Sequence, residues 1–110
     1  MKYLILYGMQ KVTTAQSMQL YDDARRLTRC VIILFEDAIL GAIRSFSRVD
    51  QSSLNQIEAI LKSNIPVYCI QEDLEARGFS PQQLLDGVHA ISYLDSITLI
   101  EQAEKLISWL

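Results

Sequence analysis

The chain has few of the residues on which metal sites and nucleophilic catalysis depend. Its 110 residues include one histidine, His89, and two cysteines, Cys30 and Cys69, which form no close pairing motif. A metal site would have no second imidazole, so we expect a surface or structural role for His89 and no metal or cofactor. No Ser-His-Asp or Cys-His spacing can be assigned. Isolated cysteines suit a reducing compartment, which predicts a cytoplasmic protein.

The chain also has no long apolar run and no excess of positive charge. The longest uninterrupted apolar run is Val31 to Phe35, far below the ~20 residues that span a bilayer. The first apolar stretch is interrupted at Gly8 and is followed by no small-residue cleavage site, so no secretory signal is predicted. A net charge of −3 provides no electrostatic footprint for nucleic acid. We therefore expect neither a membrane nor direct nucleic acid as a partner.

Apolar residues, by contrast, are plentiful. They make up 50% of the chain, and the mean hydropathy is positive at +0.16. The length predicts one domain that covers residues 1–110, and a domain of this size has one small core. Because the chain has more apolar surface than such a core needs, we expect a buried subunit interface and therefore an oligomer.

Short apolar runs alternate with helical patterns along the whole chain. This order predicts a small doubly wound α/β fold, with a parallel sheet of four strands in the order 2-1-3-4 and helices on both faces. The predicted strands are Tyr3–Tyr7, Cys30–Phe35, Ile65–Ile70 and an edge strand Val88–Tyr93. The predicted helices start at Thr13 or Thr14 and at Asp37, Leu54, Asp73, Gln82, and Asp95 or Ser96, the last of them continuing to Trp109. Ser80-Pro81, a cap serine followed by a first-turn proline, marks the start of the helix at Gln82.

In that strand order, the loops after the first and third strands meet at a switch point, where ligands of such folds usually bind. These loops are Gly8 to Thr14 and Gln71 to Asp73. The first of them resembles a loose phosphate-cradling loop, without the glycine spacing of a P-loop or a dinucleotide fingerprint. Gly8 and Lys11 are accordingly candidate binding or interface residues.

Two aspartates, Asp37 and Asp73, follow predicted strands at their carboxyl ends. Receiver domains carry carboxylates there, but they also need an acidic pair after the first strand, and Gly8 to Lys11 has none. We therefore interpret both as charges at helix N-termini, where the helix dipole favours them. Arg77 lies four residues after Asp73 in the favourable acid-first order, and Gly78 can take the left-handed conformation that ends a helix. On this interpretation Asp73→Ala costs roughly 0.5–2 kcal/mol as a lost cap, and Arg77→Ala about 0.2–1 kcal/mol as a lost exposed pair.

One stretch carries a resemblance to a known family. The pattern Val-Tyr-x-x-x-Glu-Asp-Leu-x-Ala-Arg-Gly-Phe-Ser, from Val67 to Ser80, resembles the DsrE/F/H-like family of small sulfur-relay proteins, and most of all its DsrH/TusB branch. Three other places support it: Val31 to Asp37, the Ile91-Ser92-Tyr93-x-Asp95 segment, and Ser108-Trp109-Leu110. The resemblance spans most of the chain, but it is dense only from Val67 to Gly78.

Sulfur transfer needs a cysteine whose thiolate is partly exposed and near a cation or a helix N-terminus. Cys69 lies in the middle of a predicted strand, where a buried, inert thiol is expected. Cys30 is a weak catalytic candidate: it starts the second strand, is partly exposed at best, and has Arg26 and Arg29 nearby to lower its thiol pKa. Some members of the DsrH branch have an active cysteine early in the first helix, where this chain has Ala15 to Met18.

The resemblance therefore implies a non-catalytic or docking subunit of a cytoplasmic sulfur-relay complex. Its implied partners are DsrE-like and DsrF-like subunits, and its implied pathway is tRNA 2-thiouridine synthesis or dissimilatory sulfur metabolism. Two alternatives remain open. One is a homo-oligomeric module of the same fold that binds a small ligand at the switch point, and the other is an enzyme that accepts persulfide on Cys30.

Overall fold

The computed structural model describes residues 3–8, 29–44, 57–58 and 60–109. In chain order its elements are β1 (Tyr3–Tyr7), β2 (Cys30–Leu34), the 3-10 helix η1 (Glu36–Ala42), β3 (Val67–Ile70), α3 (Gln71–Ala76), the 3-10 helix η3 (Pro81–Gln83), β4 (Val88–Ile91), α4 (Tyr93–Gln102) and β5 (Lys105–Trp109). Residues 57–58 and 60–62 are also helical, as predicted for that segment. The predicted helix after Thr13 or Thr14, with Lys11 before it, lies outside the described residues.

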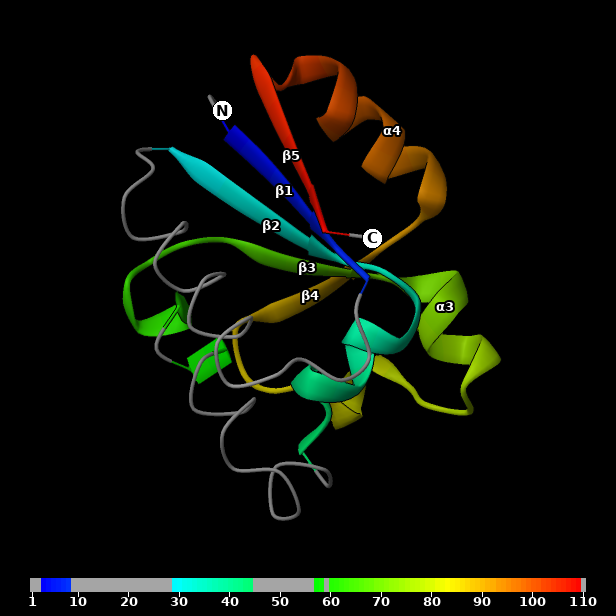
Figure 1. Ribbon diagram of the computed structural model, residues 1–110. Helices are drawn as coiled ribbons and strands as arrows, with labels where there is room; N and C mark the ends of the chain where they lie inside the picture. The colour runs from blue at the N-terminus through cyan, green and yellow to red at the C-terminus, as the bar shows by residue number, and fades with distance from the viewer. Residues whose placement is uncertain (1–2, 9–28, 45–56, 59, 110) are drawn as a thin grey trace.

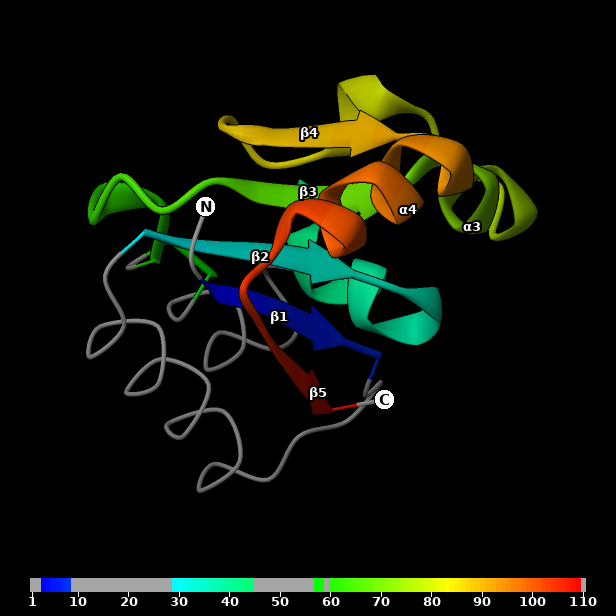
Figure 2. The ribbon, with the colours of Figure 1, turned by 90° about the horizontal axis from the view of Figure 1, so that it is seen from above.

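The predicted fold class, a small α/β domain with a parallel sheet, is confirmed (Figures 1 and 2). The sheet nevertheless has five strands in the order β4-β3-β2-β1-β5, so the predicted four strands in the order 2-1-3-4 are wrong. The first four strands lie side by side in chain order, as consecutive strands of a sheet usually do. As a result β2 separates β1 from β3, and the predicted switch point between those two strands does not exist.

The fifth strand replaces the second half of the predicted last helix. α4 ends at Gln102, and Lys105–Trp109 pairs with β1 from Tyr3↔Lys105 to Tyr7↔Trp109. The apolar spacing in this segment fits a helix as well as a strand. As a strand, this segment pairs with the backbone N–H and C=O groups along one side of β1, which a helix at the same positions could not do.

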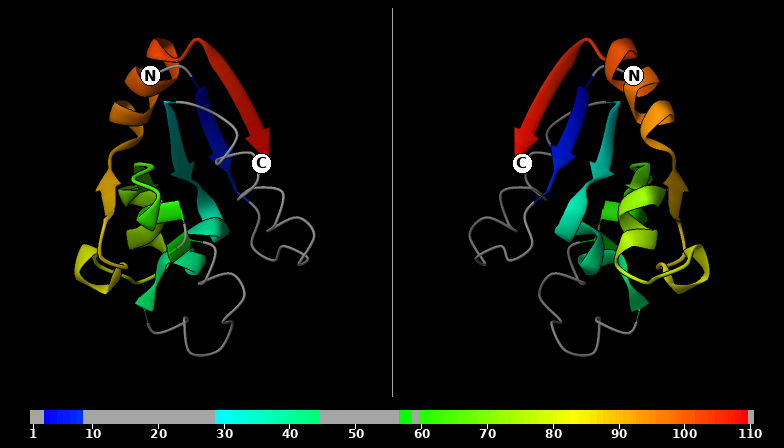
Figure 3. Two further views of the ribbon diagram at one scale, coloured as in Figure 1. Left: turned by 90° about the vertical axis from the view of Figure 1, so that its left-hand side faces the viewer. Right: turned by 90° about the vertical axis from the view of Figure 1, so that its right-hand side faces the viewer.

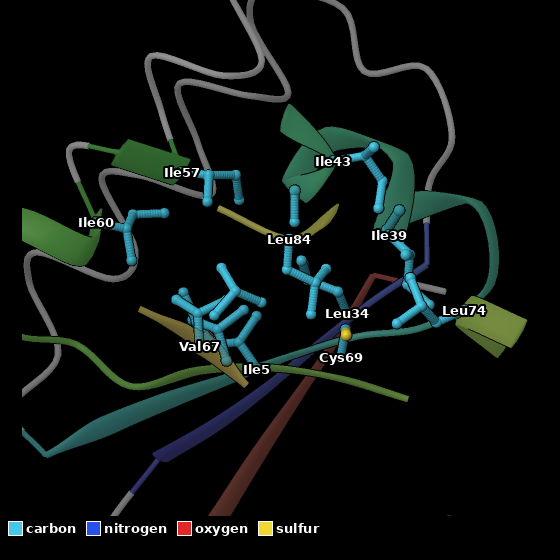
Figure 4. Packing of buried hydrophobic residues seen from close by; sticks show 14 of the residues in the cluster. Ile5, Leu34, Ile39, Ile43, Ile57, Ile60, Val67, Cys69, Leu74 and Leu84 are labelled. Atoms are coloured by element: carbon cyan, nitrogen blue, oxygen red, sulfur yellow. The ribbon is translucent and has the colours of Figure 1, made fainter. Parts of the chain in front are cut away.

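Helical elements cover both faces of the sheet, as predicted (Figure 3). On one face Leu99 and Ile100 of α4, and Ala103 directly after this helix, pack against the cluster Leu4, Leu6, Ile33 and Ile70. The larger cluster on the other face joins sheet residues to η1 and the 57–62 segment, and Figure 4 shows Ile5, Leu34, Ile39, Ile43, Ile57, Ile60, Val67, Cys69, Leu74 and Leu84 of this cluster. The connection from β4 to β5 runs back across the sheet and contains α4, which is the only described helix that packs on this face.

Short sequence patterns predicted where several helices start and end, and the structure confirms some of these predictions. The Ser80-Pro81 helix start is confirmed, since Gln83 Oε1 accepts the Ser80 backbone N–H at 2.9 Å. Gly78 has the predicted left-handed conformation, with φ of +80°. α4, however, is capped by Ser92, whose Oγ accepts the Asp95 N–H at 3.0 Å, and not by Asp95 or Ser96. Among the described helices, none has the length and apolar character to cross a membrane.

Candidate functional site

Three helical elements begin at the carboxyl edge of the sheet. η1 follows β2, α3 follows β3 and α4 follows β4. Because β2, β3 and β4 are parallel neighbours, their carboxyl ends lie side by side, and the starts of the three helices meet there (Figure 1). This edge is where α/β folds usually place their functional side chains.

Asp73 connects the three helix starts. Its side chain is only 8% exposed, its Oδ2 accepts the Glu36 backbone N–H of η1 at 2.8 Å, and its Oδ1 accepts the Tyr93 hydroxyl of α4. Its place in the first turn of α3 is as predicted, but the predicted cap is wrong: Ile70 is the N-cap residue of α3, and no side chain caps it. Asp73 is the third residue of α3, and its side chain is buried. Its carboxylate accepts hydrogen bonds from donors on η1 and α4 and caps no backbone N–H of α3.

Glu72, the residue before Asp73, contacts the same start of α4. Its two carboxylate oxygens accept the Tyr93 backbone N–H at 3.2 and 3.1 Å. α4 is therefore held by both adjacent residues of α3, one through the backbone and one through the phenol of Tyr93. Tyr93 lies in the Ile91 to Asp95 segment that supports the family resemblance. Its role was not predicted, because nothing in the local sequence pattern links it to Asp73.

The Tyr93 phenol stays protonated at neutral pH. Its hydrogen bond to Asp73 is the main cause that raises its pKa to about 12, and burial and the charges of Asp73, Glu36 and Glu72 act in the same direction. The Phe35 ring lies beside it, with ring centroids 6.5 Å apart. Tyr93 is therefore a hydrogen-bond donor to Asp73 at neutral pH.

Both cysteines of the chain are buried. Cys69 is 0% exposed, as predicted, and burial, with a smaller contribution from the Asp73 charge, raises the pKa of its thiol to about 12. Cys30 is 4% exposed, less than the partial exposure that the sequence allowed at best. The reason is its register: Cys30 pairs with Tyr3 of β1 and turns into the larger hydrophobic cluster. Arg29, the described neighbour that was expected to act on its pKa, has an exposed side chain.

The remaining candidates lie at different places in the fold. Gly8 ends β1, two strands away from α3. Asp37 is the second residue of η1, and nothing is described of its side chain. His89 is exposed on the edge strand β4, with its ring 6.4 Å from that of Tyr68, which fits the predicted surface role. Within the described part of the chain, no group of three possible metal ligands occurs.

Arg77 supports α3 from its C-terminal end. Its Nη1 donates to the Asp73 carbonyl oxygen at 3.1 Å, and the side chain is half-buried. We expect Arg77→Ala to lower the free energy of unfolding by about 0.5–1.5 kcal/mol, measured by urea titration. Gln71→Ala is the control, because it removes an exposed i,i+4 contact to Glu75 on the same helix and should cost less than about 0.5 kcal/mol. An Arg77→Ala effect that grows with protein concentration would instead place the guanidinium in a subunit contact.

Comparisons with known proteins agree on one family. The profile of the family described as "DsrH like protein" matches residues 12–106. Protein TusB of Erwinia tasmaniensis is 31% identical over 78 residues, which cover 71% of this chain and 73% of that protein.

Solved structures share the fold at low identity. The ychN protein from E. coli superposes with a TM-score of 0.83 at 16% identity and covers 98% of both chains. A conserved protein of unknown function from Bacteroides thetaiotaomicron has a TM-score of 0.72 at 19% identity, and covers 97% of this chain and 93% of its own. The family profile covers most of this chain, and the chain belongs to the DsrH-like family.

Proposed function

We propose that this protein is a non-catalytic docking subunit of a cytoplasmic sulfur-relay complex. Its partners are DsrE-like and DsrF-like subunits, and the complex serves tRNA 2-thiouridine synthesis or dissimilatory sulfur metabolism. The observation that carries the proposal is the burial of both thiols in a member of the DsrH-like family. A persulfide acceptor needs an accessible thiolate, which neither Cys30 nor Cys69 offers.

The carboxyl edge of the sheet supports the same role. Hydrogen bonds of Asp73, Glu72 and Tyr93 connect η1, α3 and α4. Such bonds keep the surface that these helices form in one conformation. A Tyr93 phenol with a pKa of about 12 provides no base at neutral pH. The edge is therefore built to fix the relative positions of helices, as a docking subunit requires.

The test is capture and mass spectrometry with the full chain. Tagged protein, produced in its source organism under reducing conditions, should recover the DsrE-like and DsrF-like subunits of that organism. After incubation with a persulfide donor, the sulfur adduct should appear on a partner, with none on Cys30 or Cys69. Failure to recover either subunit, or an adduct on Cys30, contradicts the proposal. Light scattering on the isolated chain distinguishes the homo-oligomeric alternative, which predicts a defined dimer or larger species.

A further inference from the structure

α4 exposes apolar side chains on the side that faces away from the sheet. Leu94 is 73% exposed, Ile97 50% and Tyr93 40%, although all are large hydrophobic residues in one helix. The opposite side of α4 already packs on the sheet through Leu99 and other inward residues. Figure 2 shows α4 over the sheet, with none of the described elements on its outer side. We call Leu94, Ile97 and the exposed Thr98 and Glu101 the α4 outer face.

The stretch of sequence that contains this face is acidic. Residues 71–104 contain seven carboxylates and one arginine, a net charge of −6, whereas the rest of the chain contains nine basic and six acidic residues, a net charge of +3. The carboxylates of Asp95 and Glu101 are exposed on α4 itself, and Glu72 lies at its start. Leu94 and Ile97 are therefore exposed beside the carboxylates of Asp95 and Glu101, whereas the rest of the chain has a net positive charge.

On the basis of the proposed function, we propose that the α4 outer face docks a relay subunit whose surface has an apolar centre bordered by lysine or arginine. Charge complementarity selects this occupant, because opposite potentials steer association and exclude like-charged surfaces. A two-fold pairing of α4 with α4 from a second copy would set Asp95 and Glu101 against the same carboxylates. Such a contact is disfavoured, so the partner is a different chain.

The test uses the captured complex and two kinds of variant. Leu94→Glu places a charge on the α4 outer face and, at the second position of a helix, is compatible with folding. The double variant Asp95→Lys/Glu101→Lys reverses the charge at these two positions. Each should reduce recovery of the DsrE-like and DsrF-like subunits at least about tenfold. Leu94→Ala, which is milder, should reduce it about threefold or more. Wild-type recovery should also fall as the salt concentration rises.

The controls lie on the other face of the sheet. Lys62→Glu and Glu58→Lys change charge in the 57–62 segment, and both should keep wild-type recovery. Equal recovery by wild type and all α4 variants would overturn the docking inference while the proposed function stands. No recovery by wild type would overturn the proposed function, and the docking inference with it. A dimer of the isolated chain that Leu94→Glu dissociates would overturn the choice of partner.

Discussion

Both thiols of the native protein should react with an aromatic disulfide reagent at least about a hundredfold more slowly than in the urea-unfolded chain at pH 8. Cys30 and Cys69 are 4% and 0% exposed, so the reagent reaches neither sulfur without local opening. For Cys69 the chemistry adds to the steric protection. Its pKa rises from 9.0 to about 12, and each unit is a tenfold change, so the thiolate fraction falls about a thousandfold.

Variants that keep a single cysteine show which labelling rate belongs to which thiol. Cys30→Ala leaves only Cys69, and Cys69→Ala leaves only Cys30. Slow labelling of both supports the docking role, because a persulfide acceptor needs an accessible thiolate. If Cys30 in the Cys69→Ala variant reacts nearly as fast in the native state as in urea, Cys30 is accessible, and this result favours the alternative in which Cys30 accepts persulfide.

The raised pKa of the Cys69 thiol also predicts how the stability of the protein changes with pH. The Cys69 pKa is higher in the folded state, so the stability that its neutral thiol contributes is complete below about pH 9 and is lost as the pH rises toward 12. Urea midpoints should therefore decline above pH 9 in the wild type, and Cys69→Ala should decline less. Tyr93, with its raised pKa, adds a decline of the same sign.

Asp73→Ala should lower the free energy of unfolding by about 2–4 kcal/mol. The truncation removes two hydrogen bonds from a charged acceptor and leaves the Glu36 N–H without its carboxylate partner. It also separates η1 from the start of α4, since Asp73 joins them. This is more than the roughly 0.5–2 kcal/mol expected for a helix cap, because a buried carboxylate that connects elements cannot be replaced by water.

Two milder variants bracket the effect in urea titrations. Asp73→Asn keeps one carbonyl oxygen in place and should cost about half as much as Asp73→Ala. Tyr93→Phe removes only the hydroxyl, from a side chain that is 40% exposed, and should cost less than about 1.5 kcal/mol. If Asp73→Ala costs no more than Tyr93→Phe, the bond to Glu36 contributes nothing and the bridging account is wrong.

The sequence by itself determined what depends on near neighbours. The apolar run Tyr3–Tyr7 predicted a covered strand, and β1 has these bounds. Gly78 marked the end of α3 because it takes a positive φ at little cost, and Ser80-Pro81 marked the start of η3. The alternation of strands and helices identified the α/β class, and an apolar strand interior identified the buried thiol of Cys69.

Only the tertiary structure decided what depends on contacts distant in sequence. Lys105–Trp109 is a strand because the edge of β1, a hundred residues earlier, offers backbone partners that a local pattern does not contain. Cys30 is buried by its register against Tyr3. Asp73 finds its donors 37 residues before it and 20 after it, at Glu36 and Tyr93, because parallel strands bring their carboxyl ends to one edge whatever their separation along the chain.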